Sequence, residues 1–155
     1  MARPKSYRDL IVWQKAMTLA RNVYTLTEVL PRREAYGLAD QMRRASVSIA
    51  SNVAEGYGRL TDLQFRHFLG NARGSLYEMQ TQAELAIDLG YLDKEKGGEL
   101  MAQGWEVARI LNGLLSSLRS PSLNSDTSSA NAANSANSAN SASSASSANS
   151  ASEGH

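Results

Sequence analysis

The chain contains no cysteine, two histidines and three prolines. Without cysteine it can form no disulfide and no thiolate metal site, which suits a reducing compartment. No apolar run approaches the roughly 20 residues that a membrane-spanning helix needs. A secretory signal has a charged start followed by an apolar stretch. Residues 1–8 are charged, but no such apolar stretch follows them. We therefore expect a cytoplasmic protein with no membrane partner.

Motifs of enzyme chemistry are also missing. The sequence has no HExxH, P-loop, GxGxxG, nucleophile-elbow or calcium-loop motif, and its histidines, His67 and His155, stand far apart. Paired metals in a helix bundle need Glu-x-x-His on two helices, a spacing that this chain lacks. Glu55, Glu78 and Glu84 could approach one another, but a solvent-facing or ion-paired role suits them better. We expect no catalytic residues, no metal and no cofactor.

Four segments carry apolar residues at steps of three and four, the spacing of one face of an α-helix. No segment has the pattern of a strand. Similar lengths and short connections are typical of antiparallel neighbours. We expect an all-α fold, an up-and-down antiparallel four-helix bundle, over residues 1–121. Its helices should cover about residues 8–30, 34–57, 62–89 and 93–119.

Local signals mark the expected helix ends. Ser6 with Asp9 and Thr61 with Gln64 have the spacing of a capping box, and Asp93 can cap the last helix. Proline stops a helix before it and glycine favours the end of one. The residues that indicate these ends are Pro31, Gly56, Gly90 and Pro121.

Residues 122–155 form a low-complexity segment rich in serine, alanine and asparagine, with an Asn-Ser-Ala repeat that begins at Asn134. It has no aromatic residue, and its one large aliphatic is Leu123. Such a segment cannot bury enough apolar surface to offset the ordering entropy of about 1–2 kcal/mol per residue. We therefore expect a disordered, solvated C-terminal tail.

The segment from Gly37 to Arg59 is crowded with alanine and serine, which let backbones approach closely. It has two apolar stripes at helical spacing, one through Leu38, Met42, Ala45, Ile49 and Val53, the other through Val47, Ala50 and Ala54. The first and last helices also carry two apolar seams each. A four-helix monomer would leave part of this area exposed, and large apolar patches mark interfaces. We expect a homo-oligomer.

The same segment carries a polar ridge, made of Gln41, Arg44, Ser48, Asn52 and Glu55. Unsatisfied polar groups cost about 1–3 kcal/mol when buried, so the members that border the core need partners. One interpretation is a hydrogen-bonded network that fixes helix register or a subunit contact. The other is a site for a ligand or partner.

Charge is unevenly distributed although the whole chain carries only +1. Residues 1–75 have 12 lysines and arginines against 6 acids, whereas residues 76–119 have 4 against 7. The asymmetry either forms a basic face for RNA or DNA, or lets basic and acidic helices pair within the bundle or between subunits. The candidate phosphate contacts are Lys15, Arg21, Arg43, Arg44, Arg59, Arg66 and Arg73.

Ordered motifs from residue 5 to about 119 resemble a known family. They include Tyr7-Arg-Asp-Leu-Ile-Val-Trp-Gln-Lys15, Leu30-Pro31, Tyr36-Gly-Leu38, Gln41-Met-Arg-Arg-Ala45, Ser48-Ile49, Asn52-Val-Ala-Glu-Gly56, Phe65 to Leu69 and Ala72-Arg-Gly-Ser-Leu-Tyr-Glu78. Together they resemble the 23S rRNA-intervening sequence proteins. The resemblance implies an up-and-down four-helix bundle in a homopentameric ring. It also implies relatives that are accessory proteins of the reverse transcriptases of diversity-generating retroelements.

Three functions follow as hypotheses. The first is a non-enzymatic, ring-forming binding or scaffold protein that engages nucleic acid or a nucleic-acid enzyme. The second is an accessory subunit of a retroelement reverse transcriptase. The third, from another class, is a small hydrolase or metal enzyme that uses helix carboxylates, which the missing motifs disfavour. A reverse transcriptase gene beside this one would favour the second, and metal analysis of the purified protein would test the third.

Overall fold

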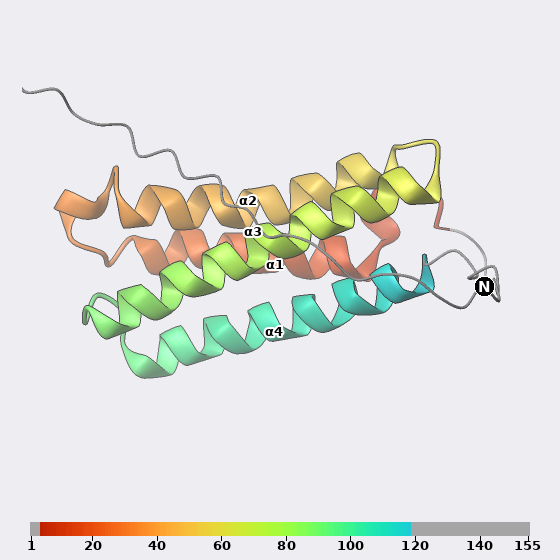
Figure 1. Ribbon diagram of the computed structural model, residues 1–155. Coiled ribbons are helices and arrows are strands. Elements are labelled where there is room, and N and C mark those ends of the chain that lie inside the picture. The colour runs from red at the N-terminus through yellow and green to blue at the C-terminus, as the bar shows by residue number, and fades with distance from the viewer. Residues whose placement is uncertain (1–3, 119–155) are drawn as a thin grey trace, which may run out of the picture. The chain divides into compact units, whose positions relative to one another are not determined.

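The computed structural model describes residues 4–118 and contains no strand within them. Its elements are η1 (Tyr7–Asp9), α1 (Ile11–Thr27), η2 (Arg32–Glu34), α2 (Leu38–Tyr57), α3 (Asp62–Asp88) and α4 (Lys94–Ser117). Four helices connected by short turns lie side by side in Figure 1. The all-α four-helix bundle that the sequence predicts is therefore confirmed. The predicted tail, residues 122–155, lies outside the described residues.

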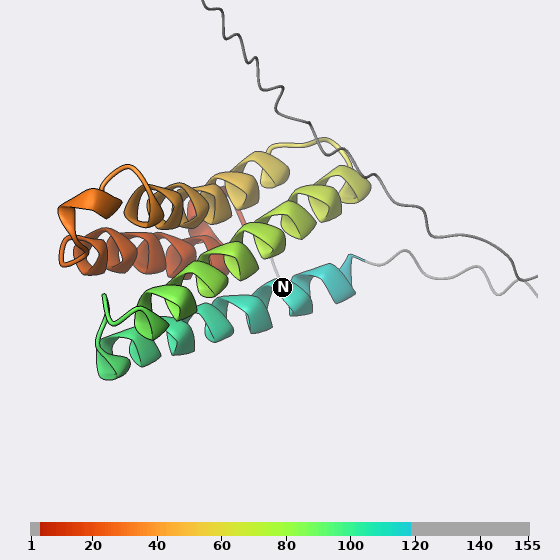
Figure 2. The ribbon, with the colours of Figure 1, turned by 60° about the vertical axis from the view of Figure 1, so that its left-hand side comes forward.

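Each helix packs against the next one along the chain, and α4 returns to pack against α1. The turned view in Figure 2 shows the same antiparallel order. The apolar periodicity determines what lies inside: the largest fully buried side chains are Leu19, Met42, Ile49, Leu69, Leu76, Met79, Leu100 and Leu111. None of the described helices is long and apolar enough to cross a lipid bilayer.

The first helix begins later than expected. Ser6 and Asp9 do form a capping box, but it caps the 3-10 turn η1. Leu10 then adopts an extended conformation, with ψ of 121°, so α1 begins at Ile11. The predicted capping box is present, but it does not mark the start of α1, because the break at Leu10 is not visible in the periodicity.

The connection between α1 and α2 is longer than expected. The expected helices end and begin at residues 30 and 34, whereas α1 ends at Thr27 and α2 begins at Leu38. After Thr27 the chain forms i to i+3 hydrogen bonds up to Leu30, and η2 occupies residues 32–34. The carboxylate of Glu34 accepts a hydrogen bond of 3.0 Å from the amide of Leu38, the first residue of α2. A side chain on Gly37 would come within 2.7 Å of that carboxylate, so glycine leaves room for this contact.

Residues of η2 also attach this corner to the turn between α3 and α4. Arg33 donates to the hydroxyl of Tyr91 at 3.3 Å, and this hydrogen bond raises the pKa of the Arg33 guanidinium. The Tyr91 hydroxyl in turn lies 3.4 Å from the carboxylate of Glu34. These two contacts join η2 to the α3–α4 turn at one end of the bundle.

The starts of α3 and α4 and the end of α3 follow their sequence signals, whereas Gly56 lies inside α2 and Pro121 lies outside the described residues. Thr61 accepts from the amide of Gln64, and Asp93 accepts from the amide of Lys96 at 2.8 Å. After α3, Gly90 has a φ of 75°, in the left-handed region that favours glycine. Tyr91 and Leu92 both donate backbone hydrogen bonds to Ala86, which closes the turn.

The α2–α3 pair shows why small residues are needed in α2. Gly56 is buried against the first turns of α3, and a Cβ atom there would lie 2.6 Å from the Cβ of Phe68 and 2.9 Å from the Phe65 ring. These atoms belong to packed side chains close to the backbone, so they cannot simply move aside. Close packing at Gly56 therefore fixes the distance between the two helices.

We predict that Gly56→Ala lowers the free energy of unfolding by up to about 2 kcal/mol. Overpacking costs about 1–3 kcal/mol, which outweighs the helix propensity of about 1 kcal/mol that alanine gains over glycine. Gly74 is the matched control, because it lies in α3 with no atom within 4 Å of its Cβ position. Urea unfolding should show Gly74→Ala to be neutral or stabilising. Equal behaviour of the two variants would contradict the packing argument.

Candidate functional site

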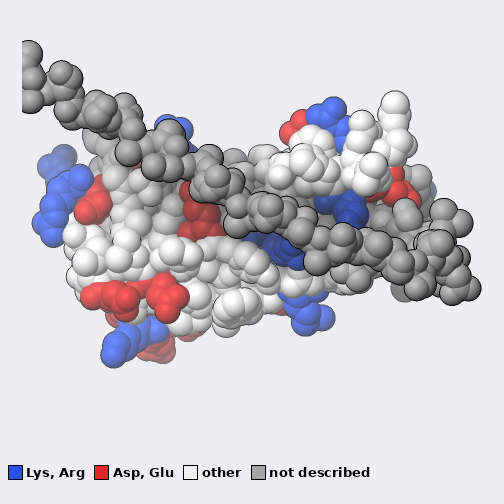
Figure 3. All heavy atoms as spheres, viewed as in Figure 1, with Lys and Arg blue, Asp and Glu red and all other residues white. Residues whose placement is uncertain are grey.

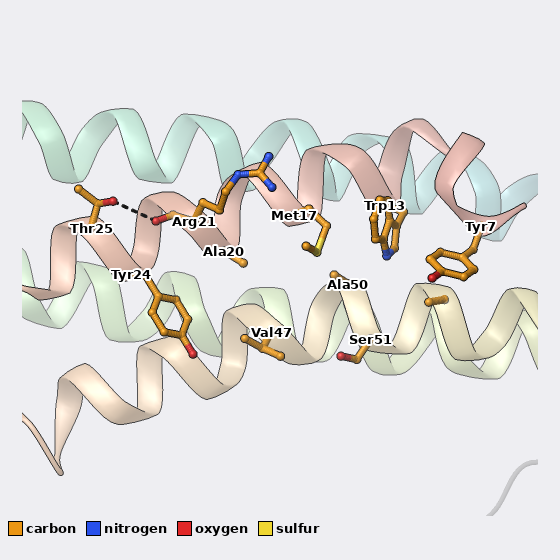
Figure 4. Close-up of a pocket in the computed structure, with 11 residues that line it drawn as sticks. Tyr7, Trp13, Met17, Ala20, Arg21, Tyr24, Thr25, Val47, Ala50 and Ser51 are labelled. Carbon is orange, nitrogen blue, oxygen red and sulfur yellow. Dashed lines mark hydrogen bonds between the residues drawn. The ribbon is translucent and has the colours of Figure 1, made fainter.

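A groove runs along the outer surface between α1 and α2, with a volume of about 640 Å³. We call it the α1–α2 groove. Figure 4 shows Trp13, Met17 and Ala20 of α1 projecting toward Val47 and Ala50 of α2. The other residues that line it are Tyr7, Arg21, Tyr24, Thr25, Ser51 and Ala54. It thus combines one apolar seam of the first helix with the second apolar stripe of the Gly37–Arg59 segment.

Two predicted arginines lie at the Tyr24 end of this groove. Arg21 lines the groove and donates to the hydroxyl of Thr18 at 3.1 Å. The guanidinium of Arg43 stands 5.2 Å from the centroid of the Tyr24 ring and donates to the Thr27 hydroxyl at 2.8 Å. No carboxylate is among the described residues that line the groove. An occupant would meet an apolar floor with positive charge at one end.

Other predicted cations are in ion pairs. Lys15 of α1 lies 3.1 Å from Glu106 of α4, and Arg44 lies 2.9 Å from Asp40 within α2. Both pairs are solvent-exposed, so each contributes little to stability. On the face shown in Figure 3, positive and negative side chains are interspersed. The seven predicted cations therefore do not form one patch.

Arg59, Arg66 and Arg73 do gather, around the N-terminal half of α3. Two adjoining hollows share Leu63 and His67 as lining residues. The first, about 450 Å³, is also lined by Arg59, Gln64 and Phe68. The second, about 380 Å³, is also lined by Arg66, Gly70, Asn71, Arg73 and Leu115. We call the set Arg59, Arg66, His67, Asn71 and Arg73 the α3 arginine face.

Each of these arginines is held in place by the bundle. Arg66 donates to the carbonyl of Leu115 at 2.8 Å, and Arg73 donates to the amide oxygen of Asn112 at 3.1 Å. Both bonds cross from α3 to α4. Arg59 instead pairs with Glu55 at 2.5 Å and lies over the ring of Phe68. Among residues 4–118, Arg66 and Arg73 have no carboxylate within ion-pairing distance.

The sequence did not identify several residues near this face. Periodicity placed Trp105 in a second apolar seam, yet 58% of it is exposed. His67, which the sequence assigns to no site, lines both hollows. Asn112 was not considered, because its role depends on the register between α3 and α4. Only contacts between helices could have revealed them.

The polar ridge divides into two parts. At its centre, the hydroxyls of Ser48 and Ser75 are 2.8 Å apart across the α2–α3 contact, and Asn52 donates to the Ser48 carbonyl and hydroxyl. These three side chains are half-buried. The outer members, Gln41, Arg44 and Glu55, are exposed. The centre has the contacts of a structural network, and the outer members remain open to solvent.

The carboxylates that the sequence left as catalytic candidates are engaged separately. Glu55 pairs with Arg59, and Glu78 accepts a hydrogen bond from Gln82 at 3.3 Å. Glu84 is exposed on α3. In the part of the chain that the structure describes, no three histidine, aspartate or glutamate side chains come together as a metal site would require.

Comparison with known proteins gives a family and a fold. The family model of the 23S rRNA-intervening sequence protein matches residues 8–113. A crystal structure of a protein with unknown function from the S23 ribosomal protein family of Bacteroides thetaiotaomicron is similar, with a TM-score of 0.64 at 21% identity. The match covers 68% of this chain and 98% of that one. No curated protein is significantly similar to the chain in sequence.

We predict that the centre of the polar ridge acts as one structural unit. Ser48→Ala and Ser75→Ala should each cost about 1 kcal/mol, the usual net value of a hydrogen bond. The double variant should cost less than the sum by about 0.5 kcal/mol or more, as expected for direct partners. Urea unfolding measures all three, with exposed Ser51→Ala as the control. Strict additivity would show that the two hydroxyls do not stabilise each other.

Proposed function

The chain belongs to the 23S rRNA-intervening sequence protein family, and we propose that it is a non-enzymatic, self-assembling cytoplasmic protein that binds nucleic acid. The α3 arginine face is the proposed nucleic-acid site, and the α1–α2 groove is the proposed assembly surface. One observation carries the nucleic-acid proposal: two adjoining hollows lined by Arg59, Arg66 and Arg73 include no carboxylate among their described lining residues.

The chemistry of these hollows matches a phosphate backbone. A guanidinium has five N–H donors, and phosphate accepts two of them side by side. The bonds from Arg66 and Arg73 to α4 each use one nitrogen, so donors remain for a ligand. Those bonds also hold the long side chains in one arrangement before binding, which lowers the entropy that binding must lose. Asn71 and His67 add further hydrogen-bonding groups.

Self-assembly is supported by the α1–α2 groove. Trp13 and Met17 are half-buried beside Val47, which is 43% exposed, although all three are apolar. A second copy of the chain would cover this surface, and the resemblance to the family implies five copies in a ring. Repeating the α3 arginine face in each copy would let modest contacts combine through multivalency.

We predict that Val47→Glu disrupts the assembly. A carboxylate in the groove would lose its hydration if a second copy covered it, whereas on an exposed helix surface it leaves the bundle folded. Light scattering at low micromolar concentration should change from an oligomer mass to a monomer mass, with unchanged helical circular dichroism. Val29→Glu, at a residue that is 64% exposed after α1, is the control. A monomeric native protein would refute self-assembly.

We predict that Arg66→Gln with Arg73→Gln weakens nucleic-acid binding uniformly across sequences. Each phosphate contact that is lost should reduce the slope of log affinity against log salt by about 0.7–0.9. The matched control is Lys15→Gln with Arg44→Gln, which removes the same charge from residues in ion pairs elsewhere. Fluorescence anisotropy at several salt concentrations measures both variants.

Three results would count against this proposal. The first is a native protein that binds neither RNA nor DNA at low salt. The second is an equal loss of affinity in the control variant, which would show that net charge alone matters. The third is a changed oligomer mass in the Arg66 and Arg73 variant, which would assign these arginines to a subunit interface.

A further inference from the structure

We infer that the nucleic acid bound by this protein is single-stranded, with bases that stack on Trp105 and Tyr77 and phosphates that contact Arg73 and Arg109. These four residues are named the α3–α4 face. The inference rests on the proposed function and adds the class of nucleic acid. It extends the α3 arginine face across the neighbouring helix.

The exposure of the two aromatic side chains is the first observation. Trp105 is 58% exposed and Tyr77 is 42% exposed, although each sits on a helix that has a complete buried face. Neither is among the aromatic pairs of the described residues, which involve Tyr7 with Trp13, Tyr57 with Phe65 and His67 with Phe68. Trp105 and Tyr77 therefore have ring surface that no other described ring covers.

The register of α3 against α4 places these rings at nearly the same level. The Gln80 side chain packs on Gly104, where its Nε2 lies 2.8 Å from the position of a Cβ. Tyr77 lies three residues before Gln80, and Trp105 lies one residue after Gly104. Because the helices run antiparallel, both displacements point the same way along the bundle. At 1.5 Å per residue the two rings differ by about 3 Å in height.

The same reasoning places two cations one helical turn farther along. Arg73 lies four residues before Tyr77, and its bond to Asn112 fixes it on the side of α3 that faces α4. Arg109 lies four residues after Trp105 and is exposed. Their heights also differ by about 3 Å. The face therefore presents a row of aromatic rings followed by a row of guanidinium groups, and it adjoins the hollow at Arg66.

Carboxylates near this face point elsewhere or lie farther along. Glu106 pairs with Lys15 of α1, on another side of α4. Glu78 accepts a hydrogen bond from Gln82, which is buried. Glu84 shares the side of Tyr77 but lies seven residues, about 10 Å, beyond it. Phosphate at Arg73 and Arg109 would therefore meet little repulsion.

Aromatic rings distinguish single strands from duplexes. In a duplex the bases are already stacked on one another, so an exposed ring on a convex helix surface cannot reach their faces. In a single strand the faces are free, and stacking on a side chain contributes about 1–3 kcal/mol per base with little sequence preference. Arginine alone would bind both forms, so the rings carry the selectivity.

The test compares two probes with the full-length protein. One is oligouridine of about 16 nucleotides, near the upper end of the site sizes found for single-strand binding folds, and the other is a duplex of equal length and mixed sequence. Trp105→Ala and Tyr77→Ala should each weaken oligouridine binding about tenfold and change duplex affinity less than about twofold. Trp105→Phe should restore most of the loss. Oligodeoxythymidine serves as a third probe that separates RNA from DNA.

Controls keep the outcomes distinct. Tyr36→Ala removes an aromatic ring that is 97% exposed before α2 and should change neither affinity. Oligouridine should quench tryptophan fluorescence in the native protein, and Trp105→Ala, which leaves Trp13 as the one tryptophan, should abolish that quenching. An unchanged oligouridine affinity in Trp105→Ala, an equal loss for both probes, or a changed oligomer mass would overturn this inference while leaving nucleic-acid binding intact. Absence of binding to all probes at low salt would overturn the proposed function as well.

Discussion

The close contact between α2 and α3 is the constraint on which the rest of the bundle depends. Phe68 packs closer to Gly56 than a residue with a Cβ atom would allow, and the hydroxyls of Ser48 and Ser75 form a hydrogen bond between the same two helices. Because α2 and α3 are fixed in distance and register, α3 packs against α4 at a defined position along the bundle axis. The bonds from Arg66 to Leu115 and from Arg73 to Asn112 depend on that height. Packing on one side of α3 therefore positions charge on the other.

The arginines of α3 illustrate how one side chain can serve both fold and surface. The guanidinium groups of Arg66 and Arg73 combine a hydrogen bond to α4 with donors left for solvent or a ligand. A lysine in either place would supply a point charge with no fixed plane. The fixed geometry of these bonds, and not a need for positive charge alone, favours arginine at these two positions. The overall charge of the chain is only +1.

Sequence reasoning recovered what depends on local chemistry. Helical periodicity identified the buried stripe through Met42, Ile49 and Val53, and the caps at Thr61 and Asp93 mark real helix starts. It missed the extended Leu10 and the separate turn η2, because periodicity continues through both. It chose Arg66 and Arg73 by their spacing on one helix, and Arg59 because it lies just before that helix. It could not place Trp105 or Asn112 beside them, since that requires the register between helices.

The N-terminal segment makes the two ends of the α1–α2 groove different. Tyr7 lines the groove at its end in Figure 4, held there by the η1 cap and by edge-to-face packing on Trp13, 5.2 Å between ring centroids. At the other end stand Tyr24 and the guanidinium of Arg43. A groove with a ring across one end and a cation at the other has no twofold symmetry of its own. The two directions along this groove are therefore not equivalent for a helix laid in it.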